Sequence, residues 1–288
     1  MSLLDFFKLI LLSAIWGGSF LFMRVAAPEF GPIVLVWLRV AIASLLFSPL
    51  LFKRSILKEL CANPGKMFIV GIFNAAVPWC LLAYAVLSLE AGFTSLLNAA
   101  TPIFAALIGF CWLRIPLTRW QILGLIIGCS GVAILAGDQL SFKEGGSGPS
   151  ILAALGATIC YGWVSQYIKR HMGDLSPWSI TIGNLFTATL LLTPFAITRI
   201  PEQLPSWPSI GCAVALAVLS TALAFLLLFD LLSRSGATAT TTVTFIIPIF
   251  GVLFGAVFLT EDVTIRIISG MAVALTGAAL TTKLIPRN

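Results

Sequence analysis

Apolar runs long enough to cross a lipid bilayer recur about ten times along this chain, with hardly a charge in the middle of any of them. A helix needs about 20 apolar residues to span the hydrocarbon core. Hydrophobic residues make up 59% of the chain and charged residues 10%, whereas a soluble domain has about 25% charged residues. A soluble domain of this composition would aggregate, so we expect a membrane protein.

The runs are continuous, which favours helices over the alternating strands of a transmembrane barrel. The predicted spans are residues 5–27, 32–52, 67–88, 91–113, 118–137, 149–170, 177–197, 208–233, 236–259 and 263–285. Short connections leave no room for a separate soluble domain. The predicted fold is therefore an all-α polytopic membrane protein with ten transmembrane helices.

Most of the 17 lysines and arginines lie in the connections on one side of these spans. Such an excess marks the cytoplasmic side of a membrane protein. An even number of spans then places both termini in the cytoplasm. The excess of basic residues is thus explained by membrane topology, and it gives no reason to expect a nucleic-acid partner.

The second half of the chain repeats the first at an offset of 145–146 residues. The matching pairs are Gly17 and Gly162, Pro32 and Pro177, Pro49 and Pro194, Pro102 and Pro248, Gly124 and Gly270, and Gly131 and Gly277. We expect an N-terminal repeat over residues 1–140 and a C-terminal repeat over residues 147–288. Each repeat has five spans, an odd number, so the second must enter the membrane from the opposite face. Inverted repeats are typical of secondary transporters, whose substrate site lies between them near the bilayer midplane.

The fourth and ninth spans each begin with small polar residues and then meet a proline, Pro102 or Pro248. Proline removes a backbone donor and frees a carbonyl in the preceding turn. Inside lipid, a freed carbonyl is tolerated only where protein or water reaches it. One interpretation is that both helices bend beside a cavity and act as gates, which the matched placement favours. The other is a structural kink whose carbonyl bonds a neighbouring serine or threonine.

Aromatic and amide side chains deep within other spans are suited to a pocket of mixed apolar and hydrogen-bonding character. The predicted substrate-binding residues are Trp16, Phe20, Asn74, Trp79, Tyr84, Asn98, Tyr161, Trp163, Gln166 and Thr241, with Pro102 and Pro248 as gating residues. Plain packing is the alternative for each of them singly. Arg39, the one charge well inside the second span, either pairs with a helix end or meets a substrate carboxylate.

No Asp, Glu or His occupies the centre of any predicted span. Proton-coupled carriers usually hold an ionisable group within the membrane, and an enzyme would need a nucleophile with a base or a metal cluster there. We therefore expect neither an enzyme nor a metal or other cofactor. The small-residue pattern Gly124-x-x-x-Gly128 permits close helix contact, either inside the bundle or in a homodimer.

The opening Trp16-Gly17-Gly18-Ser19-Phe20, followed by Arg24, Pro32 and Arg39, resembles the start of EamA-type members of the drug/metabolite transporter superfamily. Residues 84–131 are similar to the rest of that repeat. The resemblance implies ten helices in two inverted repeats around a central cavity, and export of amino acids or other small metabolites, often aromatic ones. The family often has a Glu after the fourth and ninth helices; Glu261 fits, but Ile115 stands at the matching first-half position.

Taken together, the sequence predicts a secondary transporter of small neutral or zwitterionic metabolites, with amino acids favoured, working by alternating access. Its expected location is a bacterial inner membrane, with the bilayer and a small-molecule substrate as partners. A carrier of phosphorylated or nucleotide-linked sugars is the alternative cargo class, but such anions call for more cavity Lys or Arg than this chain offers. A non-transport scaffold or channel is the other alternative.

Overall fold

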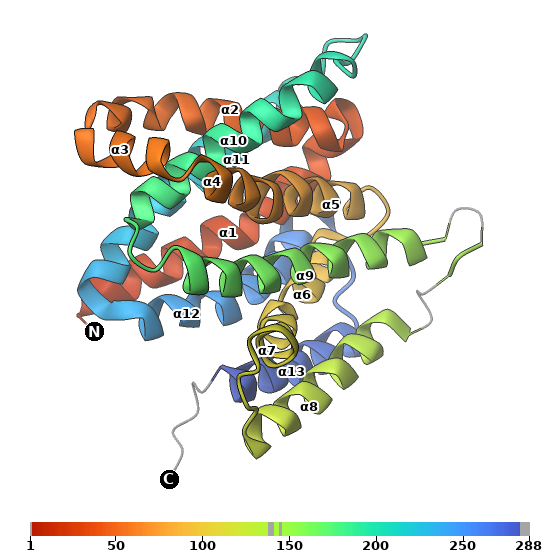
Figure 1. Cartoon of the computed structure of the whole chain (residues 1–288). Helices are drawn as coiled ribbons and strands as arrows, with labels where there is room; N and C mark the ends of the chain where they lie inside the picture. The colour runs from red at the N-terminus through yellow and green to blue at the C-terminus, as the bar shows by residue number, and fades with distance from the viewer. Residues whose placement is uncertain (1, 138–140, 144–145, 283–288) are drawn as a thin grey trace.

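The computed structural model describes residues 2–137, 141–143 and 146–282, and for residues 237–241 it describes the backbone alone. These residues form helices, turns and loops without a β-strand (Figure 1), which confirms the predicted all-α class. The first half contains α1 (Leu3–Phe30), α2 (Pro32–Phe47), the 3₁₀ turn η1 (Ser48–Phe52), α3 (Arg54–Ala62), α4 (Pro64–Val70), the π-helical segment η2 (Gly71–Ala76), α5 (Val77–Ala85), α6 (Ala91–Asn98), α7 (Thr101–Leu113) and α8 (Arg119–Ala136). The second half contains α9 (Gly148–His171), α10 (Pro177–Ile197), α11 (Trp207–Ala217), the π-helical segment η4 (Val218–Leu223), α12 (Ala224–Leu259) and α13 (Ile265–Thr281).

Nine helical stretches of the described chain are long and apolar enough to cross a membrane, and α13, with 17 residues, is a shorter tenth. A spanning helix has about 17–25 residues, so α13 is at the lower limit. The third span is built from α4, η2 and α5. The eighth consists of α11, η4 and the start of α12, which turns at Gly236 (φ 76°) into the ninth. We call the face at which α1 begins and α13 ends the terminal face, and the opposite one the distal face.

The helix contacts repeat when the two halves are exchanged. Helix α2 packs on α10, α6 on α12 and α8 on α13, and each of these pairs joins equivalent positions of the two repeats. Helix α1 packs on α11 and α12, while its counterpart α9 packs on α5 and α7. Figure 1 shows α8 and α13 next to each other, in agreement with these contacts. This exchange pattern is the one expected of two inverted five-helix repeats related by a pseudo-two-fold axis.

Close packing at two equivalent glycines carries the same symmetry to the atomic level. A Cβ placed on Gly17 would lie 2.6 Å from the Cβ of Phe250, and one on Gly162 would lie 2.8 Å from the backbone nitrogen of Ala105. Phe250 and Ala105 follow the matched prolines of the ninth and fourth spans. Each repeat therefore lays a glycine of its first helix against the proline-containing helix of the other.

The turns after the fourth and ninth spans are also alike. Arg114 and Thr260 both adopt left-handed backbone conformations, with φ of 53° and 55°. The next helices, α8 and α13, begin at N-caps Thr118 and Thr264. Serine and threonine satisfy free N–H groups at helix starts, so the repeated threonine fixes where both helices begin.

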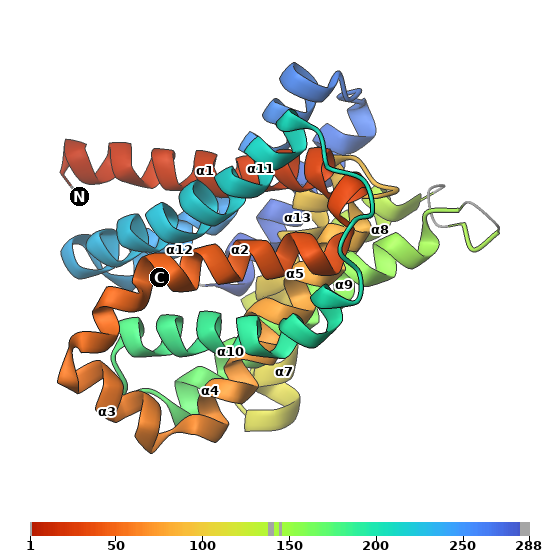
Figure 2. The same cartoon turned by 90° about the horizontal axis from the view of Figure 1, so that it is seen from above.

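The two prolines lie in different local structures, and their role as gates stays a prediction. Helix α6 ends at Asn98, and α7 begins just before Pro102, whereas α12 continues through Pro248. The Thr101 hydroxyl donates to the carbonyl of Asn98 at 2.8 Å, which is the carbonyl that Pro102 cannot bond. The equivalent of Thr101 is Ile247, which has no hydroxyl to stabilise such a turn. Helix α7 is seen end-on in Figure 1 and runs across the direction of α1 and α2 in Figure 2.

The small-residue face of α8 is used inside the chain. A Cβ on Gly124 would lie 2.7 Å from the Cβ of Leu280, and one on Gly131 would lie 2.4 Å from the backbone nitrogen of Ala274. These glycines let α8 and α13 approach closely, as small residues do in membrane helix pairs. Their face is therefore occupied by α13 and is not the one a homodimer would use.

Candidate substrate cavity

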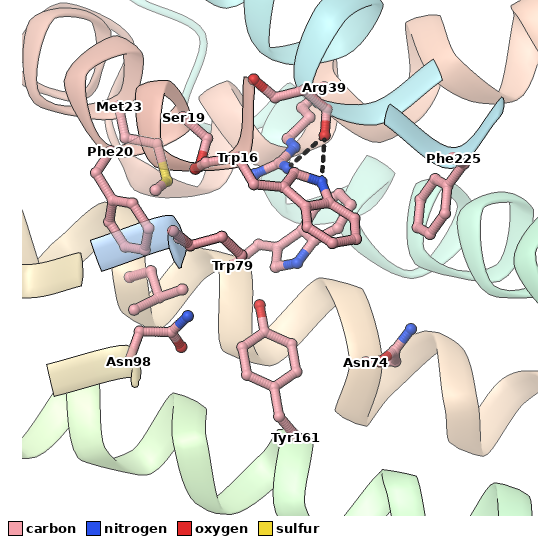
Figure 3. Close-up of a pocket in the computed structure, with 13 residues that line it drawn as sticks. Trp16, Ser19, Phe20, Met23, Arg39, Asn74, Trp79, Asn98, Tyr161 and Phe225 are labelled. Carbon is pink, nitrogen blue, oxygen red and sulfur yellow. Dashed lines mark hydrogen bonds between the residues drawn. The ribbon is translucent and has the colours of Figure 1, made fainter. Parts of the chain in front are cut away.

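A cavity of about 260 Å³ lies among helices of both repeats. Its wall consists of Trp16, Ser19, Phe20 and Met23 of α1, Arg39 of α2, Asn74 of η2, Trp79 and Leu82 of α5, Asn98 of α6, Tyr161 of α9, Ser220 of η4, and Phe225 and Ile247 of α12. Figure 3 shows these side chains pointing toward one space from several helices. The lining combines aromatic rings with a few hydrogen-bonding groups, as small-molecule sites do.

Six of the ten substrate-binding residues predicted from the sequence line this cavity. They are Trp16, Phe20, Asn74, Trp79, Asn98 and Tyr161. The structure brings them together from α1, η2, α5, α6 and α9, that is, from both halves of the chain. Their direct contact with a substrate stays a prediction.

Three others lie elsewhere. Tyr84 is 43% exposed and borders a larger, mainly apolar hollow between α2, α5 and α10, which exposed side chains such as Phe195 also line. Trp163 stacks between Trp112 and Tyr167, with ring centroids 5.6 Å and 5.2 Å away. Gln166 donates from Nε2 to the Ala105 carbonyl at 2.9 Å. Trp163 and Gln166 thus hold α7 against α9.

The remaining predicted positions contribute differently. The side chain of Thr241 lies outside the described residues. Pro102 and Pro248 do not line the cavity, although Asn98, four residues before Pro102, and Ile247, directly before Pro248, do. Any gating role of the prolines therefore acts through the helices that carry these neighbours.

The π-helical segments explain how both repeats reach the cavity. In a π-helix the hydrogen bond runs from residue i to i+5, which brings positions five apart onto one face, whereas in an α-helix positions three and four apart share a face. Asn74 and Trp79 are such a pair at η2, and Ser220 and Phe225 are the equivalent pair at η4, 146 residues later. No pattern of regular helical spacing predicts this pairing.

Trp16 and Tyr161 form a further symmetric pair, from the first helix of each repeat. Three equivalent pairs therefore surround the cavity, which places it on the pseudo-two-fold axis. A site on this axis presents comparable walls to both faces of the membrane when the repeats exchange conformations.

Arg39 breaks this symmetry and was not among the predicted binding residues. Its side chain is 6% exposed, and its guanidinium carbon lies 3.7 Å from the centroid of the Trp79 ring. Nε donates to the Thr221 hydroxyl at 2.9 Å, and a terminal nitrogen donates to the Ser220 carbonyl at 3.4 Å. The Trp16 indole N–H donates to the same carbonyl at 3.2 Å (Figure 3). The sequence did single out Arg39 as an intramembrane charge, which is a functional-site indicator by default.

Two amide side chains have polar atoms that are buried without a hydrogen-bond partner among the described residues, one on the cavity wall and one at the position equivalent to Arg39. The Oδ1 atom of Asn98, on the cavity wall, has no hydrogen-bond partner among the described residues. Asn184 occupies the position in α10 that Arg39 occupies in α2, seven residues after the first proline of its helix. Neither polar atom of Asn184 finds a partner in the described structure. Unsatisfied buried groups are uncommon and call for an explanation.

Other charges near the membrane have structural partners. Arg24 donates to the carbonyls of Val86 and Leu87, where the third span ends. Asp230 pairs with Arg234 at 3.0 Å and also with Lys8. Within the described residues no three His, Cys, Asp or Glu side chains gather into a metal-binding group.

At the distal face a carboxylate joins the two repeats. Glu261 accepts hydrogen bonds from the backbone N–H groups of Ala91 at 2.6 Å and Gly92 at 2.9 Å, the first residues of α6. We call this contact the distal cap. A carboxylate at a helix N-terminus satisfies free donors and complements the helix dipole. The neighbouring Glu90 has its pKa raised by partial burial and by the charges of Glu261 and Asp262.

Comparison with known proteins agrees with this architecture. The family model described as "EamA-like transporter family" matches residues 6–137 and 148–283, once in each half. An uncharacterized transporter of Archaeoglobus fulgidus is 25% identical over 264 residues, covering 91% of this chain and 92% of that one. The uncharacterized transporter YvbV of Bacillus subtilis is 24% identical over 270 residues, covering 92% and 87%. A solved crystal structure superposes with a TM-score of 0.66 over 99% of both chains at 18% identity, which shows a shared fold.

Proposed function

Because this chain belongs to the EamA-like transporter family, we propose that it is a secondary transporter that carries a small neutral or zwitterionic metabolite, most readily an amino acid, by alternating access. The observation that carries this proposal is the cavity between two inverted repeats, whose walls contain equivalent residues from both. Exchange of conformations between the repeats would move the opening of this cavity from one face to the other.

The size and lining of the cavity support a small amphipathic cargo. Its volume of about 260 Å³ is below the roughly 300–1,000 Å³ of drug-sized pockets. Rings from Trp16, Phe20, Trp79, Tyr161 and Phe225 offer apolar contact, and Ser19, Asn74 and Asn98 offer hydrogen bonds. Such a wall suits an amino acid with an apolar or aromatic side chain.

Carriage of phosphorylated sugars is less well supported. Phosphate groups call for clustered Lys or Arg, and Arg39 is the one such residue on the cavity wall of the described structure. Arg24, the other candidate, bonds backbone carbonyls at the end of the third span. A location in a bacterial inner membrane with cytoplasmic termini is part of the proposal, supported by the distribution of Lys and Arg.

The proposal is tested by transport into liposomes that contain only this protein. Counterflow of labelled L-phenylalanine, L-leucine and L-serine is measured against protein-free liposomes. We expect saturable uptake of at least one of them without an imposed ion gradient. Uptake that rises linearly with concentration would instead indicate a channel, and no uptake of any of the three would contradict the amino-acid assignment.

A matched pair of variants links transport to the cavity. Trp79 lines the cavity, whereas Trp120 is 43% exposed at the start of α8. We expect Trp79→Phe to raise the half-saturating concentration and Trp120→Phe to leave it unchanged. Equal effects of the two substitutions would show that the cavity is not the site of transport.

A further inference from the structure

We propose that Arg39 binds the carboxylate of the cargo, so that the transporter selects solutes that carry one carboxylate next to an apolar side chain. This assignment rests on the proposed function. It identifies one wall of the cavity as the site that binds the negatively charged end of the cargo. Arg39 lies on the cavity wall, deep in the second span and away from the aqueous faces.

The first argument is the uncompensated charge. Within the described part of the chain, the ion pairs join Asp230 to Lys8 and Arg234, and none reaches Arg39. Its contacts are a neutral hydroxyl, a carbonyl and the face of Trp79. Charges within membranes normally pair or face a water-filled cavity, and a buried charge without a counter-charge is costly. A cargo carboxylate would supply the missing negative charge.

The second argument is the geometry of the guanidinium. Arginine has five N–H donors in a planar fork that matches a carboxylate. The contacts to Thr221 and Ser220 use one N–H on Nε and one on a terminal nitrogen, which leaves other donors of the fork without a protein partner. Trp79 covers one face of the plane at 3.7 Å. The side chain is therefore held in place by neutral contacts while retaining hydrogen-bonding capacity, as a preorganised anion site requires.

The third argument is the wall across from Arg39. Figure 3 shows Asn98, Tyr161 and Asn74 on the side of the cavity opposite Arg39. The unpartnered Oδ1 of Asn98 is an acceptor that suits an ammonium group. An α-amino acid has both a carboxylate and an ammonium, so it matches the two walls, whereas an amine or an amide matches only one.

The second repeat does not provide a second anion site. The residue equivalent to Arg39 is the neutral Asn184, on the helix that packs against η2. One guanidinium compensates one negative charge, which fits a carboxylate better than a doubly charged phosphate. The cargo is thus expected to bind in one orientation despite the symmetric backbone.

The test compares acids with their amides on the wild-type protein. Counterflow of the labelled amino acid that the protein carries is inhibited with L-phenylalanine or L-phenylalaninamide, with L-leucine or L-leucinamide, and with inorganic phosphate, at a pH where the amines are protonated. We expect the amides to require at least about tenfold more inhibitor than the acids, which corresponds to about 1.4 kcal/mol. Equal inhibition by acid and amide, or stronger inhibition by phosphate than by the acids, would overturn the assignment.

Variants then identify the residue. We expect Arg39→Gln to reduce the difference between acid and amide to a factor of about two or less. The matched control Arg24→Gln removes an arginine that does not line the cavity and should keep the full discrimination. Retained discrimination in a folded Arg39→Gln protein would overturn the proposal.

The carboxylate site and the proposed transport function would be contradicted by different results. If Arg39→Gln does not fold, the comparison of acid and amide on the wild-type protein still decides whether a carboxylate is recognised. Saturable flux without discrimination would contradict the carboxylate site alone. Absence of flux for every labelled amino acid would contradict the proposed function and, with it, this inference.

Discussion

The two repeats share the same backbone features but differ in the side chains at equivalent positions. Each has a π-helical segment in its third span, a left-handed residue after its fourth and a proline within its fourth. Yet Arg39 is matched by Asn184 and Glu261 by Ile115, and the helix breaks before Pro102 but not at Pro248. The common backbone allows two states related by the pseudo-two-fold axis, and the different side chains decide how cargo binds and which state is favoured.

The distal cap is the clearest of these differences. Glu261 follows a left-handed residue and donates its own backbone N–H to Gly255, while Ile115 does the same with Gly109. The turns are alike, but an isoleucine cannot bond the start of the ninth span as Glu261 bonds that of α6. The state seen here, with the distal face capped, therefore has a stabilising contact that its counterpart lacks.

Substitution of the packed glycines is expected to have the largest effect and to be equally severe in both repeats. Gly17→Ala and Gly162→Ala would each place a Cβ under 3 Å from a neighbouring helix, and overpacking costs about 1–3 kcal/mol or more. Both should lower the thermal stability of the detergent-solubilised protein. Gly211→Ala, where a Cβ meets nothing within 4 Å, is the control. If one of the pair were tolerated like the control, the structural equivalence would be broken.

Removal of the distal cap should have the next largest effect. Glu261→Gln replaces charged hydrogen bonds at the α6 N-terminus with neutral ones, and loss of a helix cap costs about 0.5–2 kcal/mol. We expect a lower melting temperature and greater access to the cavity from the distal face. Ile115→Glu should also increase access from the distal face, because it supplies the missing carboxylate at the terminal face and so stabilises the counterpart state, in which that face is capped. A Thr260→Ser variant, which keeps the turn and the cap, serves as a control for general perturbation.

Substitution of Asn184 should have an effect of opposite sign. Its amide is fully buried and lacks partners among the described residues, and an unsatisfied buried group costs about 1–3 kcal/mol. We expect Asn184→Leu to leave stability unchanged or to raise it, with transport retained. A loss of transport in the folded variant would mean that both members of the Arg39 and Asn184 pair serve the cargo.

Glu90 should give the smallest effect, visible as a pH dependence. Its raised pKa means that the folded protein binds the proton more tightly than the unfolded chain does, so this group adds stability as the pH falls through the folded pKa. At neutral pH its charge is unfavourable because of burial, Glu261 and Asp262, with Arg24 opposing them. Glu90→Gln should therefore raise the melting temperature slightly at pH 7, and the gain should shrink toward pH 4. A gain that grows on acidification would show the opposite sign.

The length of the apolar runs was sufficient to predict the spans, because a bilayer sets the length of a spanning helix and requires its backbone to be hydrogen-bonded internally. The repeat of glycines and prolines, with an odd number of spans in each half, was sufficient to predict the inverted architecture. Six cavity residues were predicted because aromatic and amide side chains deep in a span are suited to an internal pocket. Trp163 and Gln166 were assigned to the cavity because composition does not tell which face of α9 meets α7. Arg39 was recognised as unusual, but only the structure shows that it lacks a carboxylate partner.

The π-helical segments could not be predicted from the sequence. Nothing in residues 71–76 marks an extra backbone residue, and regular helical spacing places Asn74 and Trp79 on different faces. The break before Pro102 is similar, since it depends on the hydroxyl of Thr101 and the matched Pro248 lacks that neighbour. Local hydrogen bonds of this kind are decided by three-dimensional context.

The most direct test of the account is the accessibility of one cavity position from both faces of the membrane. In a background without the native cysteines, Ser19→Cys places a thiol on the cavity wall, and a membrane-impermeant maleimide is applied from either side. The account predicts that labelling from the distal face rises in both Glu261→Gln and Ile115→Glu, and that labelling from the terminal face falls in both. Labelling that rises or falls on both faces together, or from one face alone whatever the variant, would contradict alternating access through this cavity.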